Sequence, residues 1–455
     1  MGRKEIRVLC PNGHLGYGLT KEESFHLGLE ARPDFIVCDS GSCDIGPGSL
    51  GSDTSVSPYE WQKHDLELML LGGRRLGIPV IVSSAADSGA NSRVNLFVDV
   101  VKELAKKHKL PKFKLGYFYS EVSKSYIKEK LQAGKVIEGL DGRPPFTEED
   151  LDKTDKMVLM AGIHPFIKLL DMGADVIIGG RASDICPTAA AGIREGFPEA
   201  LSYHMGKLIE CASFCAEPYG GKESVVGTLT HDDIKVTAMH PNQRCTIASV
   251  AGHSMYERTN PFFEYFTGGM IDLTQCQYEQ YDEKTTRATG ARYIPAKALL
   301  AKLEGSGKVG EKYIGMAGIR DPYSIEHIDG VIEWARDQVR AKYGDSGYQL
   351  LYHVYGRNAI MKDLEPMRDA RSHELCIVVE GIAPTREMAH DVAMTGTRQI
   401  FYARLPQVKG TAGLAAFLFE EVLYAGPAYQ WTANHLVPLD DPMEPFSVHM
   451  TEAGI

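Results

Sequence analysis

The stretch PDFIVCDSGSCDIGPGSLGSD, residues 33–53, joins a short apolar run to a loop of glycine, serine and aspartate. The apolar run is typical of a strand buried on both faces, and the loop has too few apolar side chains to form a core. The same order recurs through the first half of the chain, where apolar runs alternate with amphipathic segments. We expect strands at 6–10, 34–40, 79–84, 113–120 and 174–180, and helices at 21–31, 59–77, 91–109, 125–134, 157–173 and 184–196.

The alternation predicts an α/β fold whose N-terminal domain, residues 1–220, is a doubly wound, mostly parallel sheet with helices on both faces. After about residue 220, shorter alternating runs are separated by glycine-rich turns. This pattern predicts a second, mixed α+β domain over residues 221–455 that completes a cleft. In it we expect strands at 235–240, 245–253, 348–356 and 373–383, helices at 325–344 and 385–405, and a proline-rich segment, 434–450, wrapped over an existing surface.

Composition excludes several classes of function. The chain has 455 residues and a net charge of −11, which argues against nucleic acid or an anionic membrane as a partner. No apolar stretch has the length of a membrane span, and the N-terminus lacks a signal-peptide pattern. The nine cysteines lie scattered through apolar segments. We therefore expect a cytoplasmic enzyme with reduced thiols.

Polar loops follow four of the five predicted strands, and parallel strands end at one rim of their sheet. These loops are PNGHLGYG (11–18), residues 39–53, SAADSGAN (84–91) and RASD (181–184). Ligands of open parallel sheets bind at that rim, so convergence of the loops predicts an active site there. The alternative is that the loops are polar only because strand-to-helix loops ordinarily are.

Known loop motifs are absent. The glycines of residues 11–18 follow GxxGxG rather than GxGxxG, so a dinucleotide site is a minor alternative and we expect neither nicotinamide nor flavin. No GxxxxGK[ST] or GxSxG motif occurs. Two cysteine pairs, Cys38 with Cys43 and Cys211 with Cys215, lack zinc-knuckle spacing and are better explained as core thiols.

Carboxylates at the rim are the strongest candidates for chemistry. Asp39 ends a buried strand, where a charge needs a metal, an arginine or backbone N–H partners. Asp44 lies in a loop that can bend back beside it, and Asp184 follows the fifth strand. We predict that Asp39 and Asp44 are catalytic, and that both can share Mg²⁺ or Mn²⁺ with Asp184. Arg181 suits a substrate carboxylate or phosphate; the alternative is that it pairs with Asp39 or Asp184.

In the second half, His253 follows an apolar stretch among hydroxyl side chains and is a candidate acid or base, although a lone histidine there is usually an interior residue. Arg244 is close to it in sequence, and further polar loops surround AGIRDP (317–322) and YGRN (355–358). The residues that we predict to bind substrate are Ser40, Ser42, Ser84, Arg181, Arg244, Arg320 and Asn358.

Four of these segments together resemble the acyclic terpene utilisation family AtuA: LGYG (15–18), residues 33–53, SSAADSGAN (83–91) and IIGGRASD (177–184). The similarity extends through NQRCTIASVAGHSMYER (242–258), LEGSGKVG (303–310), AGIRDP and NHLVPLDDP (434–442). It implies a catabolic enzyme of the lyase kind, without fixing a terpene substrate. Two features depart from the family: Asp87 stands where many members have small residues, and a C-terminal extension carried by some relatives is missing. The second departure implies a small companion subunit.

Three functions remain open. The first is a lyase or hydro-lyase that acts on a small carboxylate or an acyl-CoA thioester by acid–base chemistry. The second is a half-site subunit, inert until a small partner chain binds. The third is a metal-dependent hydrolase. A small-molecule substrate and a homo-oligomeric assembly are expected in each case.

Overall fold

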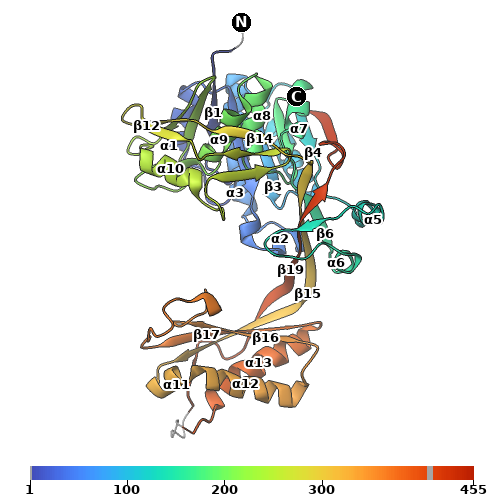
Figure 1. Ribbon diagram of the computed structural model, residues 1–455, viewed down its shortest axis with the longest axis vertical. Coiled ribbons are helices and arrows are strands. Elements are labelled where there is room, and N and C mark those ends of the chain that lie inside the picture. The colour runs from blue at the N-terminus through green and yellow to red at the C-terminus, as the bar shows by residue number, and fades with distance from the viewer. Residues whose placement is uncertain (1–2, 407–412) are drawn as a thin grey trace. The chain divides into compact units, whose positions relative to one another are not determined.

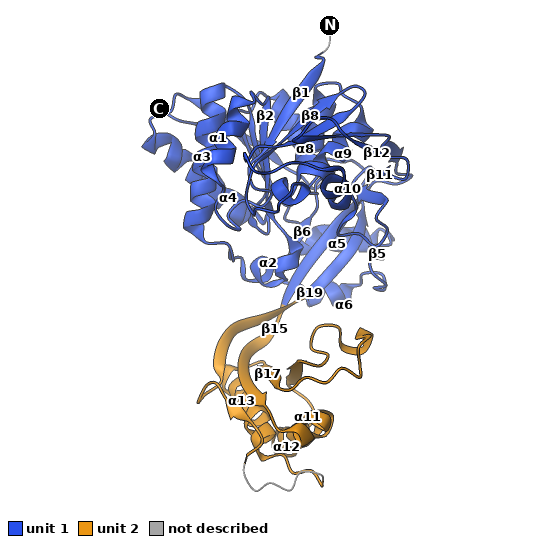
Figure 2. Ribbon diagram, turned by 90° about the vertical axis from the view of Figure 1, so that its left-hand side faces the viewer, with its two compact units in different colours: residues 1–307, 431–455 blue, residues 308–430 orange. Residues whose placement is uncertain are grey.

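The computed structural model, which describes residues 3–406 and 413–455, divides into two compact units (Figures 1 and 2). Unit 1 contains residues 1–307 and 431–455, and unit 2 contains residues 308–430. The mixed α/β class is confirmed, with both parallel and antiparallel strand pairs. The boundary expected at residue 220 falls inside unit 1 instead. The reason is strand pairing, because residues 225–230 bond to the first strand along its whole length.

Unit 1 is built on a ten-stranded sheet whose centre is parallel. The parallel strands lie in the order β1 (Glu5–Cys10), β2 (Phe35–Gly41), β3 (Val80–Asp87), β7 (Val176–Gly179) and β4 (Phe113–Phe118). These are the five strands that the sequence predicts. Antiparallel strands extend the sheet beyond β1 with β8 (Val225–Thr230), β9 (Ile234–Ala238), β13 (Thr285–Thr289) and β12 (Gln277–Gln280), and beyond β4 with β20 (Val448–Ala453).

Helices cover this sheet because its strands are apolar on both sides. Successive side chains of a strand face opposite ways, so Ile36 and Cys38 of β2 join one core cluster and Phe35 and Val37 join the other. The first cluster is completed by α1 (Glu22–Glu30), α3 (Tyr59–Leu76) and α4 (Asn91–Lys107). The second is completed by α7 (His164–Asp171), α8 (Cys186–Arg194) and α9 (Glu199–Ile209).

Two segments differ from the secondary structure that the sequence predicts. The helix expected at 157–173 begins as a strand, β6 (Lys156–Leu159), because this apolar run pairs with a later strand. The strand expected at 245–253 is the helix α10 (Ile247–Met255). Its start is fixed locally, since Thr246 and Ser249 form a reciprocal capping box.

The proline-rich C-terminal segment does more than wrap a surface. It ends in β20, which pairs antiparallel with β4 and is the last strand on that side of the main sheet. Smaller elements complete unit 1: η1 (Cys43–Ile45), α2 (Gly48–Ser52), α5 (Lys124–Gln132), β5 (Glu138–Gly139), α6 (Glu148–Asp152), η2 (Ala212–Cys215), β10 (Phe263–Phe266), β11 (Gly269–Asp272) and β14 (Arg292–Pro295).

Unit 2 has a core of its own, in which helices pack on an antiparallel sheet. The chain enters it along β15 (Leu300–Ile319) and leaves along β19 (Leu423–Pro438). Its other elements are α11 (Pro322–Glu326), α12 (Ile328–Tyr343), β16 (Gln349–Tyr355), η3 (Lys362–Leu364), β17 (Leu375–Ala383), α13 (Arg386–Tyr402) and β18 (Ala416–Phe417).

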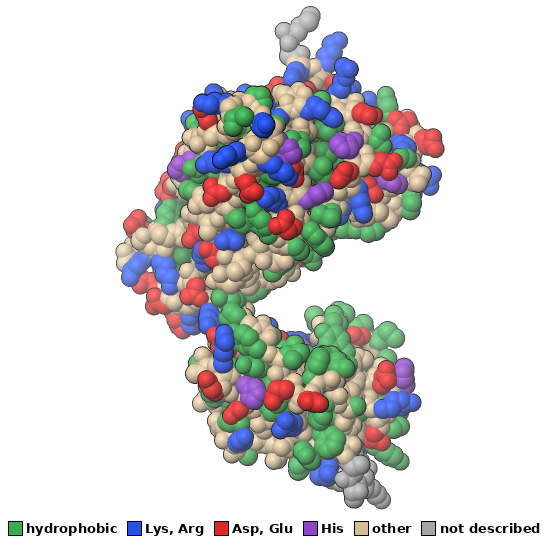
Figure 3. Space-filling view, turned by 180° about the vertical axis from the view of Figure 1, so that it is seen from behind, with side chains coloured by type: hydrophobic (Ala, Val, Ile, Leu, Met, Phe, Trp, Pro, Cys, Tyr) green, Lys and Arg blue, Asp and Glu red, His purple; other side chains and the backbone are tan. Residues whose placement is uncertain are grey.

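Two surface properties bear on function. Acidic and basic side chains are intermixed on the face shown in Figure 3, where no broad basic surface of the kind that binds nucleic acid is seen. Among the helices of residues 3–406 and 413–455, none is long and apolar enough to cross a membrane.

Candidate functional site

The loops that follow β2, β3 and β7 meet at one rim of the sheet, as expected for parallel strands. Asp39, at the end of β2, accepts a hydrogen bond from the Ser83 hydroxyl of β3 at 2.5 Å. The hydroxyl of Ser84 accepts a hydrogen bond from the backbone N–H of Ala182, beyond β7, at 3.3 Å. Side chains therefore tie the three strand ends together.

This junction is tightly packed and leaves little room for a ligand. A methyl group on Gly41 would lie 2.4 Å from the Asp87 carbonyl oxygen, and one on Gly89 would lie 2.3 Å from the Arg181 backbone nitrogen. Ser84 and Asp87 have left-handed backbones, with φ of 48° and 75°. The strand ends consequently form a rigid support rather than an open pocket.

The loop after β1 is held by a carboxylate from α3. Asp65 accepts hydrogen bonds from the Asn12 side chain and from the backbone N–H groups of Gly16 and Thr20, at 2.8–3.0 Å. A negatively charged side chain thus occupies the N–H groups that a phosphate would need. This explains the glycine-rich loop without a nucleotide.

The first residues of the loop at 39–53 have mainly a structural role. Asp39 is buried, and its second carboxylate oxygen accepts from the Gly41 N–H. Ser40 is buried and donates to the Leu15 carbonyl, while the Ser42 hydroxyl accepts from the Asp44 N–H. The space between this loop and Arg181 is about 10 Å³, room for about one water molecule.

Asp87, which departs from the family pattern, also has a structural role. Its carboxylate accepts from the backbone N–H groups of Val56 and Ser57 and from the Ser57 hydroxyl, at 2.6–3.0 Å. Burial opposes the charge, but these hydrogen bonds and His14 outweigh it and lower the pKa of Asp87. Asp87 therefore anchors the loop that leads into α3.

Arg181 is engaged by a partner that the sequence did not indicate. Its guanidinium donates to both carboxylate oxygens of Glu304 in β15, at 2.9 and 3.3 Å, and to the Ser84 hydroxyl at 3.2 Å. Burial favours protonation of Glu304, but Arg181 and Lys302 outweigh it and lower its pKa to about 2. Arg181 thus supports the site from within and is not free to clamp a substrate anion.

Three further residues that we predict to bind substrate have surroundings of their own. Arg244 is exposed and pairs with Glu217 at 3.6 Å. Arg320 and Asn358 belong to unit 2, where Arg320 lines a separate cavity of about 440 Å³. None of the three is among the residues that line the cavity of unit 1 described next.

A cavity of about 200 Å³ in unit 1 gathers charged side chains beside Asp184. Of its charged residues, only Asp184 was predicted from the sequence. The cavity is lined by Met160, Ser183, Asp184, Ile185, Lys207, Glu210, Glu257, Arg258, Glu264, Tyr265 and Lys302.

Asp184 is a titratable group of this cavity whose hydrogen bonding is incomplete among the described residues. Its side chain is 43% exposed, yet its Oδ1 atom is buried and, among the described residues, accepts no hydrogen bond. The nearest cation is the Arg181 guanidinium, 3.5 Å away. Burial, reinforced by Asp39, raises the pKa of Asp184 to about 7. This carboxyl group is therefore poised between its two protonation states at neutral pH.

Lys207 lies close to three other acids of the cavity, Glu210, Glu257 and Glu264. Its ammonium group lies 2.5 Å from the Glu210 carboxylate, 3.7 Å from Glu264 and 4.0 Å from Glu257. Glu264 also pairs with Arg258, at 3.1 Å. Burial raises the pKa of Glu210 and of Glu257, and Asp44 adds to the effect on Glu257. Asp44 thus contacts this network from the loop after β2.

His253 lies in α10 beside the same network, but it is a poor acid or base. Its ring is 5% exposed and stacks on Tyr256, with ring centroids 4.6 Å apart. Burial, with Lys207 and Arg258 nearby, lowers the pKa of His253 to about 3. The ring is therefore neutral at physiological pH, and its buried Nε2 atom has no hydrogen-bond partner among the described residues.

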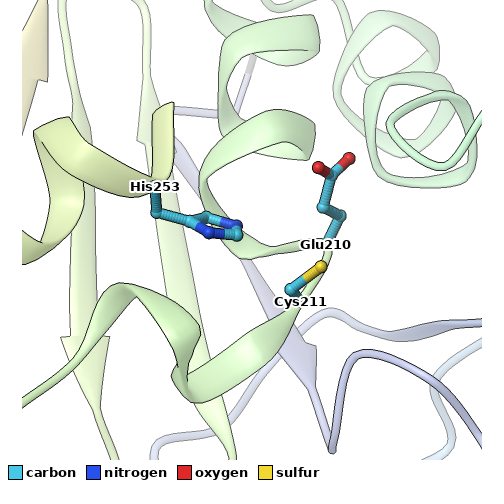
Figure 4. Close-up of side chains that lie close together, drawn as sticks. All are labelled: Glu210, Cys211 and His253. Atoms are coloured by element: carbon cyan, nitrogen blue, oxygen red, sulfur yellow. The ribbon is translucent and has the colours of Figure 1, made fainter. Parts of the chain in front are cut away.

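Figure 4 shows the His253 ring directed toward Glu210 and Cys211. One ligand atom from each of these residues lies within 4.8 Å of the others. Within residues 3–406 and 413–455 this is the only group of three such side chains at that spacing, and the ligand atoms of Asp39, Asp44 and Asp184 do not lie that close together. The sequence signal for these buried charged groups is GKLIEC (206–211), where a lysine and a glutamate interrupt an otherwise apolar helix end.

Comparison with known proteins shows similarity to a sequence family. The model of the acyclic terpene utilisation family protein AtuA matches residues 6–429. No curated protein and no solved structure matches.

Proposed function

Since the chain belongs to the acyclic terpene utilisation family AtuA, we propose that it is a catabolic lyase or hydro-lyase whose site is the charged cavity of unit 1. The observation that carries the proposal is Oδ1 of Asp184, which accepts no hydrogen bond among the described residues and lies at the edge of a cavity lined by further acids and by cations. A carboxyl group in this situation can accept and return a proton at neutral pH.

The chemistry follows from the charges around Asp184. In a hydro-lyase reaction, the Asp184 carboxylate would take a proton from the carbon next to a substrate carboxylate or thioester. The C–H electron pair would form the double bond, and the hydroxyl group on the next carbon would leave as water after taking a proton from Glu257. Lys207 and Arg258 would stabilise the negative charge that develops on the substrate carbonyl.

The size of the cavity favours a small acid. About 200 Å³ is below the usual range for the pockets of drug-sized ligands, so the space suits a carboxylate of a few carbon atoms. A coenzyme A moiety would have to remain outside it. The proposal therefore places only the acyl portion of a thioester in the cavity.

The test is a screen of the purified chain against small hydroxycarboxylates and their coenzyme A thioesters, with products identified by mass. We expect loss of water or cleavage of a C–C bond, and a rate that rises with pH through about 7 as Asp184 loses its proton. Asp184→Asn should lower kcat by at least about 100-fold, the usual contribution of a general base. Asp99→Asn, on the exposed face of α4, is the matched control and should change nothing.

Other results would argue against this function or favour a different one. Full activity of Asp184→Asn with an unchanged pH profile would remove Asp184 from the reaction. Hydrolysis of an ester or thioester bond would favour a hydrolase. Turnover only after a small partner chain is added would favour the half-site subunit. The companion subunit, the homo-oligomer and the cytoplasmic location stay predictions.

A further inference from the structure

We infer that Glu210, Cys211 and His253 form a binding site for a divalent transition-metal ion of the Zn²⁺ type. The inference goes beyond the lyase proposal and does not need it, because ion binding can be measured without a substrate. It also differs from the Mg²⁺ or Mn²⁺ site expected from the sequence, both in its residues and in its donor atoms.

The first support is the position of the three side chains. Glu210 and Cys211 are consecutive, directly after the end of α9, and His253 projects from α10 toward them (Figure 4). Their ligand atoms already lie within 4.8 Å of one another. Bonds of about 2.0–2.3 Å to a tetrahedral ion would bring these atoms about 3.3–3.8 Å apart, a side-chain adjustment on the order of 1 Å.

The second support is the unused nitrogen of His253. A buried ring nitrogen without a hydrogen bond is costly, and buried polar atoms in folded proteins usually have a partner. Nε2 of His253 is buried and has none among the described residues, although the ring is directed at a carboxylate and a thiol. A metal ion would supply the missing partner.

The charges around the three side chains are of both signs. The acids of the adjoining cavity are Asp184, Glu210, Glu257 and Glu264, and its cations are Lys207, Arg258 and Lys302. Lys302 also pairs with Glu304, 3.0 Å away, and Arg181 lies 3.5 Å from Asp184. Lys207 touches one Glu210 oxygen at 2.5 Å and would have to share that carboxylate with the ion.

The donor set decides the kind of ion. A thiol sulfur and an imidazole nitrogen suit Zn²⁺ and its neighbours, whereas Mg²⁺ prefers oxygen ligands alone. Three protein ligands leave one tetrahedral position open, and one of the ligands, Glu210, also lines the cavity. Binding would release the Cys211 thiol proton to solvent.

The test uses Co²⁺ as a coloured substitute for Zn²⁺. The full-length protein, freed of metal by a chelator, is titrated with Co²⁺ and followed by the absorption band of thiolate bound to cobalt. We expect one equivalent to bind with this band, and Zn²⁺ to displace it. Cys211→Ser should lose the band, and His253→Gln should weaken binding at least tenfold.

Cys276→Ser is the matched control, because Cys276 lies 4.0 Å from a different histidine, His204, without a third ligand at this spacing. It should bind Co²⁺ as the unchanged protein does. Circular dichroism checks that each variant is folded. The inference is overturned if the unchanged protein shows no thiolate band, if Cys211→Ser keeps it, or if only Mg²⁺ binds. Asp184→Asn should keep the band even when turnover is lost, so the two proposals can fail separately.

Discussion

At the scale of residues, the acids and bases of the rim divide into those that hold the structure and those that face the cavity. Arg181, Glu304 and Asp87 have complete sets of partners and tie strand ends together. Among the described residues, one Asp184 oxygen accepts no hydrogen bond and has only the 3.5 Å ion pair with Arg181, and one His253 nitrogen has no hydrogen-bond partner. These two incompletely satisfied groups are the candidates for function at this rim.

Removal of the Glu304 charge should destabilise unit 1 most at neutral pH. In Glu304→Gln the buried Arg181 loses its carboxylate, which typically costs about 3–5 kcal/mol. The folded pKa of Glu304, about 2, lies below its unfolded value of about 4.3. The stabilisation is therefore present above about pH 4.3 and is lost as pH falls toward 2.

Urea unfolding at pH 7 and at pH 3 checks this expectation. The gap in unfolding free energy between the unchanged protein and Glu304→Gln should be smaller at pH 3. Glu103→Gln, which breaks a surface pair with Lys63, should cost far less than Glu304→Gln at pH 7 and should change little with pH. A gap that is the same at both pH values would show that the ion pair is not the source of the stability.

At the scale of elements, the site depends on how closely the ends of β2, β3 and β7 approach. Hydrogen bonds and glycine contacts hold the strand ends together, so the loops cannot open independently. The cavity lies beside this junction and is lined from the loop after β7, the end of α9, the segment that follows α10, β10 and β15. A helix at α10, where a strand was expected, directs His253 toward Glu210.

A methyl group at Gly89 should break this junction. Gly89 and Gly134 both have left-handed backbones, with φ of 65° and 74°. Alanine at either position carries the cost of that conformation, about 1–2 kcal/mol. At Gly89 it would also collide with the Arg181 backbone, whereas Gly134 has open space. Thermal melting should show a clearly larger loss for Gly89→Ala, and equal losses would contradict the packing argument.

At the scale of the whole molecule, the two units differ in how the chain builds them. Unit 1 is discontinuous, since residues 431–455 return to it and add β20 to its sheet. Unit 2 is one continuous segment with a separate hydrophobic core. Each unit therefore has the internal contacts that independent folding requires.

The isolated segment 308–430 should fold alone, because its core is made from its own residues. We expect a cooperative urea transition followed by circular dichroism. The matched control is residues 221–455, cut at the boundary that sequence suggested. It should not fold cooperatively as one body, since β8 would lack its partner β1. A cooperative transition only in the longer segment would contradict the division into units.

The sequence alone determined the α/β class, the five parallel strands and the meeting of their loops, because these depend on local apolar patterns and on the direction of parallel strands. It also identified Asp184 as a rim residue. Only the tertiary structure decided that Arg181 pairs with Glu304, 123 residues away in the chain, and that Glu210, Cys211 and His253 meet. Such contacts join segments distant in sequence, and no local pattern encodes them. The loop at 39–53 therefore supports the candidate site through Asp39 and reaches its edge through Asp44, while the cavity itself is lined from the loop after β7, the end of α9, the segment after α10, β10 and β15.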